Sequence, residues 1–395
     1  MDLNYFAGAL TGICTHSLLA PGRKLVWTII ANPGAGGFTI KQRWKKHRAI
    51  LEDYSSKAQA NPTRPCCPSH TAGQSVSGNQ NACGKYDEKS LAENGLVLTC
   101  GPGHAKQIAE TLINEAAAEL DKSNKSSSHN KASEASPFYL IITAGGDGTS
   151  WEVLSALYHA PQQVRDSAVI LRLPMGTGND GADAPELDGA LEFLVKPVKI
   201  EKTAALRLLS SPSGPASSKG PFLAFNILSV GLDAFVTHMT NKMKGKLPGD
   251  SYKLWVDIAS LIYDQLYKVD YMDVKALDAQ GKFITSFREK VLLLAVGASG
   301  HRTYGSHKKI LPDERNVCTV RQMPLLRKVA LKGLFTTGKH ITKPESILFN
   351  ANRVEFSAMH PILAQMDGET VLLERSDFPA AIELTEKVIP VLKLV

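Results

Sequence analysis

The sequence lacks any apolar stretch of the ~18 residues that a helix needs to cross a bilayer. The short apolar run within residues 1–20 begins after Asp2 and has no basic segment before it, so it does not fit a secretory signal peptide. A lipid-attachment motif ending at Cys14 also fails, because Ile13 stands where a small residue is required. We therefore expect a cytoplasmic protein whose contact with membranes is peripheral.

Signs of two other classes of site are also missing. The six cysteines form no CxxC pair, and no histidine follows them at zinc-finger spacing, so we expect reduced thiols. No short block of lysine and arginine stands out, and we expect no nucleic-acid partner. The net charge of +7 is compatible with anionic lipid or with nucleotide phosphates and does not choose between them.

The chain of 395 residues is too long for one ordinary core and predicts two domains. In the first, residues 22–205, apolar runs alternate with helical patterns, which predicts an α/β domain with a wound parallel sheet. Polar stretches near 54–93 and 121–136 lack periodicity and are predicted to be inserts outside its core. The predicted strands are 24–31, 95–99, 138–143 and 168–174, and the predicted helices include 40–52 and 102–120.

In the second predicted domain, residues 206–395, short strand patterns dominate. Only a few helical patterns interrupt them, chiefly 252–267 and 325–333, and the strand series continues to 388–395. This pattern predicts an antiparallel β-sandwich.

Glycine-rich turns follow three of the predicted parallel strands, at residues 32–37, 145–149 and 176–180. Ligands of wound sheets bind at the carboxyl ends of the strands, so the three turns are expected to converge on one site. Glycines let backbone N–H groups approach phosphates, and a following helix N-terminus adds a favourable dipole. Asp147 lies inside the second turn, where a carboxylate beside a polyphosphate implies a cation or a proton transfer.

These turns resemble the motifs of the diacylglycerol kinase catalytic-domain family, whose superfamily includes sphingosine and ceramide kinases and bacterial lipid kinases. The matching segments are Asn-Pro-Gly-Ala-Gly at 32–36, Gly-Gly-Asp-Gly-Thr at 145–149, Gly-Thr-Gly-Asn-Asp at 176–180 and Asp-Gly-Glu at 367–369. The resemblance implies a lipid kinase that uses ATP and Mg²⁺, with diacylglycerol as the favoured acceptor. It also implies a set of nucleotide-binding residues: Asn32, Gly36, Thr99, Gly145, Gly146, Asp147, Gly148, Thr149, Glu152, Thr177 and Asn179.

The resemblance implies catalytic carboxylates as well, namely Asp147, Asp367 and Glu369. Glu369 matches the residue that accepts the proton of the lipid hydroxyl in bacterial-type members, at a cleft between the domains. In the sphingosine kinase branch the aspartate that matches Asp147 has this role, so both remain candidates for the general base. Without the resemblance, the segment 367–369 fits better as an ordinary hairpin turn with two solvated carboxylates.

The chain departs from the family pattern in two places. Residues 181–183, Gly-Ala-Asp, stand where the family has an aromatic residue, alanine and arginine, which removes one expected phosphate or substrate contact. Arg315 replaces the glycine of an Asp-Asp-Gly-like segment that holds a magnesium in some bacterial members. Asp313 and Glu314 are kept as candidate metal ligands, although the positive charge of Arg315 argues against a metal there.

Two basic stretches, 239–247 and 325–343, are either solvated faces or a contact with anionic membrane lipid. The first carries Lys242, Lys244 and Lys246. Alternative functions are a sphingoid-base or ceramide kinase, a soluble kinase like the NAD kinases, and a lipid-binding regulator without catalysis. The sequence does not predict the oligomeric state.

Overall fold

The computed structural model describes residues 2–60, 95–126, 136–211, 222–243, 261, 263–305 and 308–395. The chain forms two compact units: unit 1 is Met1–Thr203 with Val388–Val395, and unit 2 is Ala204–Lys387. These bounds differ from the predicted 22–205 and 206–395 at both ends of the chain. An N-terminal helix packs into the core of unit 1, and the last strand returns to the sheet of that unit.

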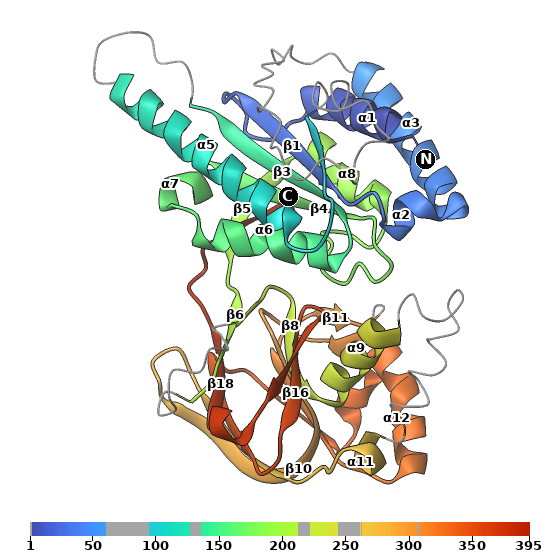
Figure 1. Ribbon diagram of the computed structural model, residues 1–395, viewed down its shortest axis with the longest axis vertical. Coiled ribbons are helices and arrows are strands. Elements are labelled where there is room, and N and C mark those ends of the chain that lie inside the picture. The colour runs from blue at the N-terminus through green and yellow to red at the C-terminus, as the bar shows by residue number, and fades with distance from the viewer. Residues whose placement is uncertain are drawn as a thin grey trace. The chain divides into compact units, whose positions relative to one another are not determined.

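Unit 1 is built around a sheet of six strands, counted over the described residues, with the order β2-β1-β3-β4-β19-β5 (Figure 1). The strands are β1 (Leu25–Ala31), β2 (Leu96–Leu98), β3 (Phe138–Gly145), β4 (Ala168–Pro174), β5 (Val198–Thr203) and β19 (Ile389–Leu394). Neighbouring strands are parallel, except that β5 pairs antiparallel with β19. The predicted wound parallel sheet is therefore confirmed, and β4 has the predicted bounds.

The helices of unit 1 lie on both faces of this sheet (Figure 1). They are α1 (Leu3–Thr15), α2 (Gly36–Thr39), α3 (Lys41–Ala60), α5 (His104–Ser126), α6 (Asp147–His159), α7 (Gln162–Arg165) and α8 (Leu187–Val195). Helix α3 continues to residue 60, past the predicted start of the insert at 54, and the i,i+4 pair of Lys57 with Asp53 supports this extension. Most of the two predicted inserts lies outside the described residues.

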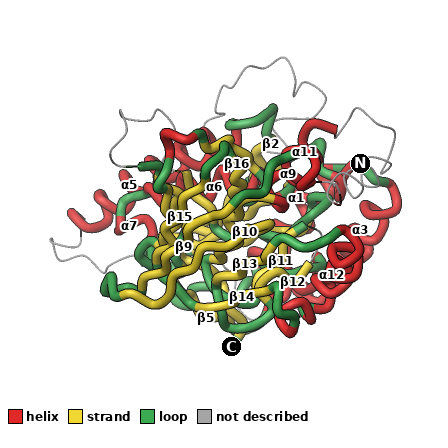
Figure 2. The backbone as a smooth tube through the Cα atoms, turned by 90° about the horizontal axis from the view of Figure 1, so that it is seen from below, coloured by secondary structure: helices red, strands yellow, loops and turns green. Residues whose placement is uncertain are grey.

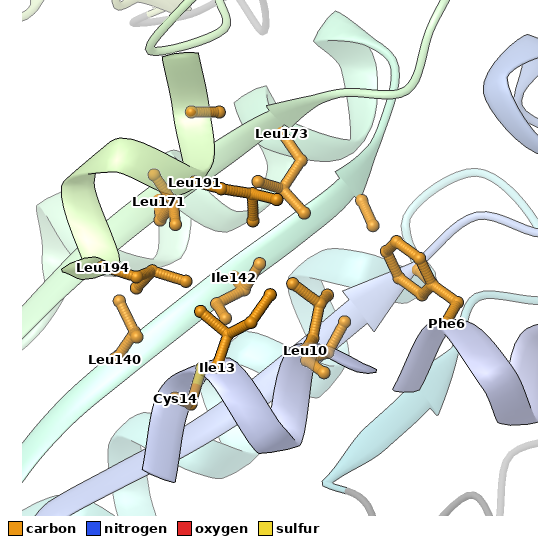
Figure 3. Close-up of a cluster of buried hydrophobic side chains, with 14 of the residues drawn as sticks. Phe6, Leu10, Ile13, Cys14, Leu140, Ile142, Leu171, Leu173, Leu191 and Leu194 are labelled. Carbon is orange, nitrogen blue, oxygen red and sulfur yellow. The ribbon is translucent and has the colours of Figure 1, made fainter. Parts of the chain in front are cut away.

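Helix α1 was not predicted, yet it supplies much of the core of unit 1. Its fully buried residues Phe6, Leu10 and Ile13 recur at helical spacing and form one apolar face. This face packs with side chains of β3, β4 and α8, as Figure 3 shows for Ile142 of β3. The apolar run that does not fit a signal peptide is thus a core helix.

Unit 2 is an antiparallel β domain. Over the described residues its main sheet has eleven strands, with the path β17-β16-β8-β10-β9-β15-β18-β6-β7 and with β13 between β10 and β14. The strands of unit 2 are β6 (Leu206–Leu209), β7 (Phe222–Ala224), β8 (Ile227–Gly231), β9 (Tyr271–Leu277), β10 (Phe283–Gly297), β11 (Arg302–Tyr304), β12 (Lys308–Leu311), β13 (Val317–Arg321), β14 (Ser346–Phe349), β15 (Arg353–Ala358), β16 (Ile362–Met366), β17 (Glu369–Leu373) and β18 (Ala380–Leu384).

The long strand β10 explains how this sheet closes over a core. Its first half pairs with β9 and has alternating exposure, whereas its second half, from Val291, pairs with β8 and β13 and is buried throughout. Figure 2 shows β9, β10, β13 and β14 side by side. Strands from both halves contribute to one core cluster, so the sheet curls on itself. The prediction of an antiparallel β domain after the α/β domain is confirmed, with one curled sheet in place of two separate ones.

Three α-helices accompany the described strands of unit 2: α9 (Leu232–Met243), α11 (Tyr263–Leu266) and α12 (Leu325–Thr337). Two short 3-10 helices, η1 (Lys339–Thr342) and η2 (Arg375–Asp377), follow. Helix α12 extends four residues beyond its predicted end and ends at Gly338, whose φ of 76° is left-handed. Most of the helix predicted at 252–267 falls outside the described residues. In the part of the chain that the structure describes, none of the helices has the length and apolarity of a bilayer-crossing segment.

Candidate active site

The carboxyl ends of β1, β3 and β4 bring the three glycine turns together. A Cβ added at Gly176 would lie only 2.5 Å from the Cα of Gly146, so the second and third turns touch through their backbones. The first turn joins them through Gly37, whose N–H donates to the carbonyl of Met175 at 2.7 Å. Since β2 and β3 flank β1 in the sheet, the chain reverses its winding at β1, and this is the position at which wound sheets bind ligands.

The first turn is held by its own side chain. Asn32 accepts a hydrogen bond from the N–H of Gly34 at 2.9 Å through its Oδ1, which closes the turn after β1. Gly36 follows, and a Cβ there would meet Arg43 Nη1 at 3.3 Å and Thr177 Oγ1 at 3.4 Å. Gly36 therefore lies between a cation from α3 and a hydroxyl from the third turn.

The second turn becomes the first turn of α6. Gly146 is the N-cap residue of this helix, and Asp147 is its first helical residue. At Gly145 a Cβ would overlap the Oγ1 of buried Thr149 at 2.4 Å, so only glycine fits there. Gly148 has open space around it and is exposed. The N-terminus of α6 thus presents backbone donors with little steric cover, an arrangement that suits an anion.

Asp147 is oriented by the third turn. Its Oδ1 accepts a hydrogen bond from the N–H of Gly181 at 2.9 Å. Its Oδ2 would lie 3.0 Å from a Cβ added at Gly178, and the Oδ2 of Asp180 would lie 3.5 Å from the same point. Two carboxylates therefore border Gly178, although the sequence alone had singled out only Asp147.

The third turn carries Thr177 and Asn179. Thr177 is exposed, whereas Asn179 has a left-handed φ of 58° and donates through its Nδ2 to the carbonyl of Pro174 at 3.1 Å. Within the described structure, the buried Oδ1 of Asn179 accepts no hydrogen bond. Just beyond the turn, Asp183 accepts three hydrogen bonds from the backbone and guanidinium of Arg172. Asp183, where the family has an arginine, therefore closes the loop internally.

Thr99 and Glu152 lie beside the turns and have structural contacts. The N–H of Thr99 donates to the carbonyl of Ala31 at 2.8 Å, which places it next to the first turn. Glu152 of α6 accepts from the N–H groups of Gly103 at 2.7 Å and Lys106 at 3.3 Å, so it caps the N-terminus of α5. Glu152 thereby ties the loop after Thr99 to α6.

Comparisons with known proteins find similar sequences and similar folds. Residues 95–209 match the family described as the diacylglycerol kinase catalytic domain. Proteins named as YegS-like lipid kinases are 26% identical over 288 residues in Yersinia enterocolitica and 28% identical over 235 residues in Cronobacter sakazakii. The matched regions cover 71% and 58% of this chain and 83% and 71% of the relatives.

The match over residues 95–209 and the similarity to YegS-like lipid kinases support the diacylglycerol kinase catalytic-domain family for this chain. The same matches support a phosphotransferase with a lipid alcohol acceptor. A solved structure from Bacillus anthracis that is assigned to the diacylglycerol kinases is similar in fold, with a TM-score of 0.52 and 16% identity over 92% of this chain and 94% of that one. A second structure from the same organism has a TM-score of 0.50 over 92% of this chain and 96% of the other.

In unit 2, the family's late Asp-Gly-Glu segment forms the hairpin between β16 and β17. Met366 pairs with Glu369, so Asp367 and Gly368 form the two-residue hairpin loop. Their φ values of 48° and 106° are left-handed, as such a loop requires. The Asp367 carboxylate accepts hydrogen bonds from the backbone N–H groups of Phe225, Asn226 and Ile227. Asp367 is therefore a structural carboxylate that fixes the hairpin to the start of β8.

Glu369 differs from Asp367 in its surroundings. Its side chain is exposed, and it accepts no hydrogen bond from any residue that the structure describes. A buried polar network holds the adjoining turn: Gln365 accepts from the N–H of Gly368 at 3.1 Å and donates to Ser229 at 2.8 Å. Ser229 in turn donates to Asp233 at 2.7 Å. Glu369 thus has a free carboxylate on a rigidly held turn, as a general base requires, and its catalytic role stays a prediction.

The candidate metal ligands Asp313 and Glu314 engage different partners. Arg315 donates to the Asp313 carboxylate from its backbone and guanidinium, and this contact holds the pKa of Asp313 below its usual range. Glu314 is solvent-exposed and meets His301 at 3.2 Å. Over the described ranges, no three His, Cys, Asp or Glu side chains are grouped as metal ligands. The side chains at this position therefore give no support to a metal site.

Proposed function

We propose that this kinase transfers the γ-phosphoryl group of ATP to the hydroxyl of diacylglycerol, which yields ADP and phosphatidic acid. The observation that carries the proposal is the convergence of three glycine turns around Asp147 at the switch point of the sheet. The lipid oxygen forms a bond to the γ-phosphorus as the bond from phosphorus to the bridging oxygen of ADP breaks. The proton of the hydroxyl passes to a carboxylate.

The backbone around the N-terminus of α6 has the character of a phosphate site. Gly146 and Gly148 leave the N–H groups of the turn accessible, and the helix dipole favours negative charge there. Asn32, Gly36, Thr99, Gly145, Thr149, Thr177 and Asn179 complete the nucleotide site in this proposal. Glu152 contributes indirectly, because its carboxylate already caps α5.

Mg²⁺ fits the carboxylates at this place. Magnesium in kinases is held by one or two carboxylates together with the substrate's phosphates and water, so no closed protein cage is needed. Asp147 and Asp180 border Gly178 and would supply the protein oxygens. When bound, the ion neutralises charge on the transferring phosphoryl group.

Two residues share the proposed role of general base. Asp147 lies at the phosphate turn, and its Oδ1 already receives the N–H of Gly181, which fixes the direction of the carboxylate. Glu369 is exposed and unbonded among the described residues, so it is available to accept the proton. Asp367 supports Glu369 by holding the hairpin rather than by touching the substrate.

We also propose that the kinase contacts the membrane peripherally through α12. Arg327 and Lys328, which the sequence offered as lipid contacts, are ion-paired with Glu345 and Asp264. The exposed face of the helix is instead apolar, with Leu326 85% and Val329 52% exposed. In the first basic stretch, Lys242 is exposed, and Lys244 and Lys246 lie outside the described residues.

Leu326→Glu tests this contact. A charge on a face that enters the headgroup region should weaken sedimentation with vesicles that contain anionic lipid. The control is Met359→Glu, which places the same charge on a residue of unit 2 that is 60% exposed. Equal sedimentation of both variants would contradict a membrane role of α12.

Incubation with ATP labelled in its γ-phosphate and a panel of lipid micelles and NAD tests the function. Label in phosphatidic acid supports the proposal, and label in a phosphorylated sphingoid base or ceramide supports the alternative lipid acceptors. Label in NADP would replace the lipid by a soluble substrate. Absence of label from every acceptor, with a folded protein, would favour a lipid-binding regulator.

A further inference from the structure

Arg43 is a cation that borders two of the converging turns, and the family resemblance gave it no role. Its Nη1 donates to the carbonyl of Gly176 at 3.1 Å. The same nitrogen would lie 3.3 Å from a Cβ added at Gly36, and the Oγ1 of Thr177 would lie 3.4 Å from that point. The guanidinium therefore borders the first and the third turn at once.

The start of α3 explains this placement. Helix α2 ends at Thr39, and α3 begins at Lys41, so the third residue of α3 is still next to the first turn. The N–H of Trp44 donates to the carbonyl of Ile40 at 2.9 Å, which joins the two helices without a flexible loop. Arg43 is half-buried, whereas its neighbour Lys45 is exposed.

The guanidinium of Arg43 has more N–H donors than its described hydrogen bond uses. Arginine carries five N–H donors. Within the described residues, the side-chain hydrogen bond of Arg43 runs from its Nη1 to the carbonyl of Gly176. Among the described residues no carboxylate forms an ion pair with Arg43, in contrast to Lys46 and Arg48 of the same helix, which pair with Glu186 and Glu52. A half-buried, uncompensated cation is costly unless an anion meets it, and a planar guanidinium suits phosphate oxygens.

The other arginine near the third turn is not available for this purpose. Arg172 is bound by Asp183, and both side chains are largely buried, with 12% and 5% exposure. The turn itself, residues 176–181, contains no basic residue. Positive charge at the phosphate end of the site must therefore come from outside the turn.

We propose that Arg43 binds the polyphosphate of the nucleotide and that its bond to the Gly176 carbonyl holds it in position to do so. The inference rests on the proposed function, because it assigns a ligand to the same site. A guanidinium at this point distinguishes ATP and ADP from adenosine, since only the phosphates carry the charge it recognises.

Binding of ATP, ADP and adenosine to the full chain, measured by calorimetry, tests the proposal. Arg43→Ala should weaken ATP and ADP binding by about 10- to 100-fold, as loss of a charge-assisted hydrogen bond does, and change adenosine binding by less than about 3-fold. Arg43→Lys should recover part of the loss, because it keeps the charge without the planar fork. Lys45→Ala is the matched control, since it removes one exposed charge from the same helix.

Two results would overturn the inference and leave the proposed function intact. In the first, Arg43→Ala binds ATP as tightly as Lys45→Ala. In the second, the affinities for ATP and adenosine fall by the same factor, which would show that Arg43 only supports the Gly176 turn. Failure of the wild-type protein to bind ATP would overturn the proposed function and the inference together.

Discussion

Gly176→Ala probes the closest approach between the second and third turns. The new methyl group would lie 2.5 Å from the Cα of Gly146 and 2.9 Å from the Oδ1 of Asn179. Carbon atoms pack best at about 3.5–4.0 Å, so the methyl group would have to push a backbone atom away by about 1 Å. Asn179 is itself fixed by its hydrogen bond to Pro174 and by its left-handed backbone. Neither neighbour can yield by a simple rotamer change.

Overpacking of this kind costs about 1–3 kcal/mol, a sizeable part of the ~5–15 kcal/mol that stabilises a typical domain. Chemical unfolding should therefore show a lower free energy of unfolding for Gly176→Ala. The matched control is Gly148→Ala in the first turn of α6, where an added Cβ meets nothing within 4 Å. Since alanine is favoured over glycine in helices by up to about 1 kcal/mol, this variant should be as stable as the wild type or more so. If Gly176→Ala unfolded at the wild-type denaturant concentration, the turns could not be in contact as described.

Three further predictions concern unit 2. Asp367→Asn should lower the free energy of unfolding by about 1–3 kcal/mol, because the carboxylate accepts hydrogen bonds from three backbone N–H groups. Glu369 is exposed, so Glu369→Gln should leave the unfolding midpoint unchanged and lower kcat by at least ~100-fold. Wild-type turnover in Glu369→Gln would leave Asp147 as the base. Burial lowers the pKa of His340 to about 4, below the ~6.5 of an unfolded histidine, so its contribution to stability is complete above pH 6.5 and is lost as the pH falls toward 4, by up to about 3 kcal/mol. Urea unfolding at pH 7 and pH 4.5 should show a smaller decrease for His340→Gln than for the wild type, and an equal decrease would assign the acid sensitivity to other groups.

The parallel sheet could be predicted because its strands are continuous apolar runs that end in glycine turns. For β4 this pattern gave the correct bounds, because six of its seven residues are apolar and buried. Helix α1 could not be recognised, because an apolar N-terminal stretch has the same composition whether it is a leader or a core helix. The return of β19 to the first sheet is a long-range pairing, with Val391 opposite Ile170, that local patterns do not encode.

For the candidate site, the glycine motifs predicted the three turns and their convergence, but they did not predict which side chains the turns engage. Glu152 matched a nucleotide ligand by its position in the motif, whereas the structure shows that it caps α5. Its partner Lys106 lies 46 residues earlier in the sequence, so a local motif could not reveal this contact. Asp183 stands where an arginine was expected, and its pairing with Arg172 depends on the fold of the loop. Arg43 lies outside every recognised motif. The short connection between α2 and α3 places it beside the turns, where it contacts Gly176.

The most direct test of the account is phosphoryl transfer by the Asp147→Asn variant. Asparagine keeps the size of the side chain and an Oδ1 that can accept the N–H of Gly181, so the unfolding midpoint should stay at the wild-type value. Loss of the charge should lower the rate of γ-phosphate transfer from ATP to diacylglycerol micelles by at least ~100-fold. Labelled phosphatidic acid is expected from the wild type, and almost none is expected from a folded Asp147→Asn protein. Equal labelling by the two proteins would contradict the account.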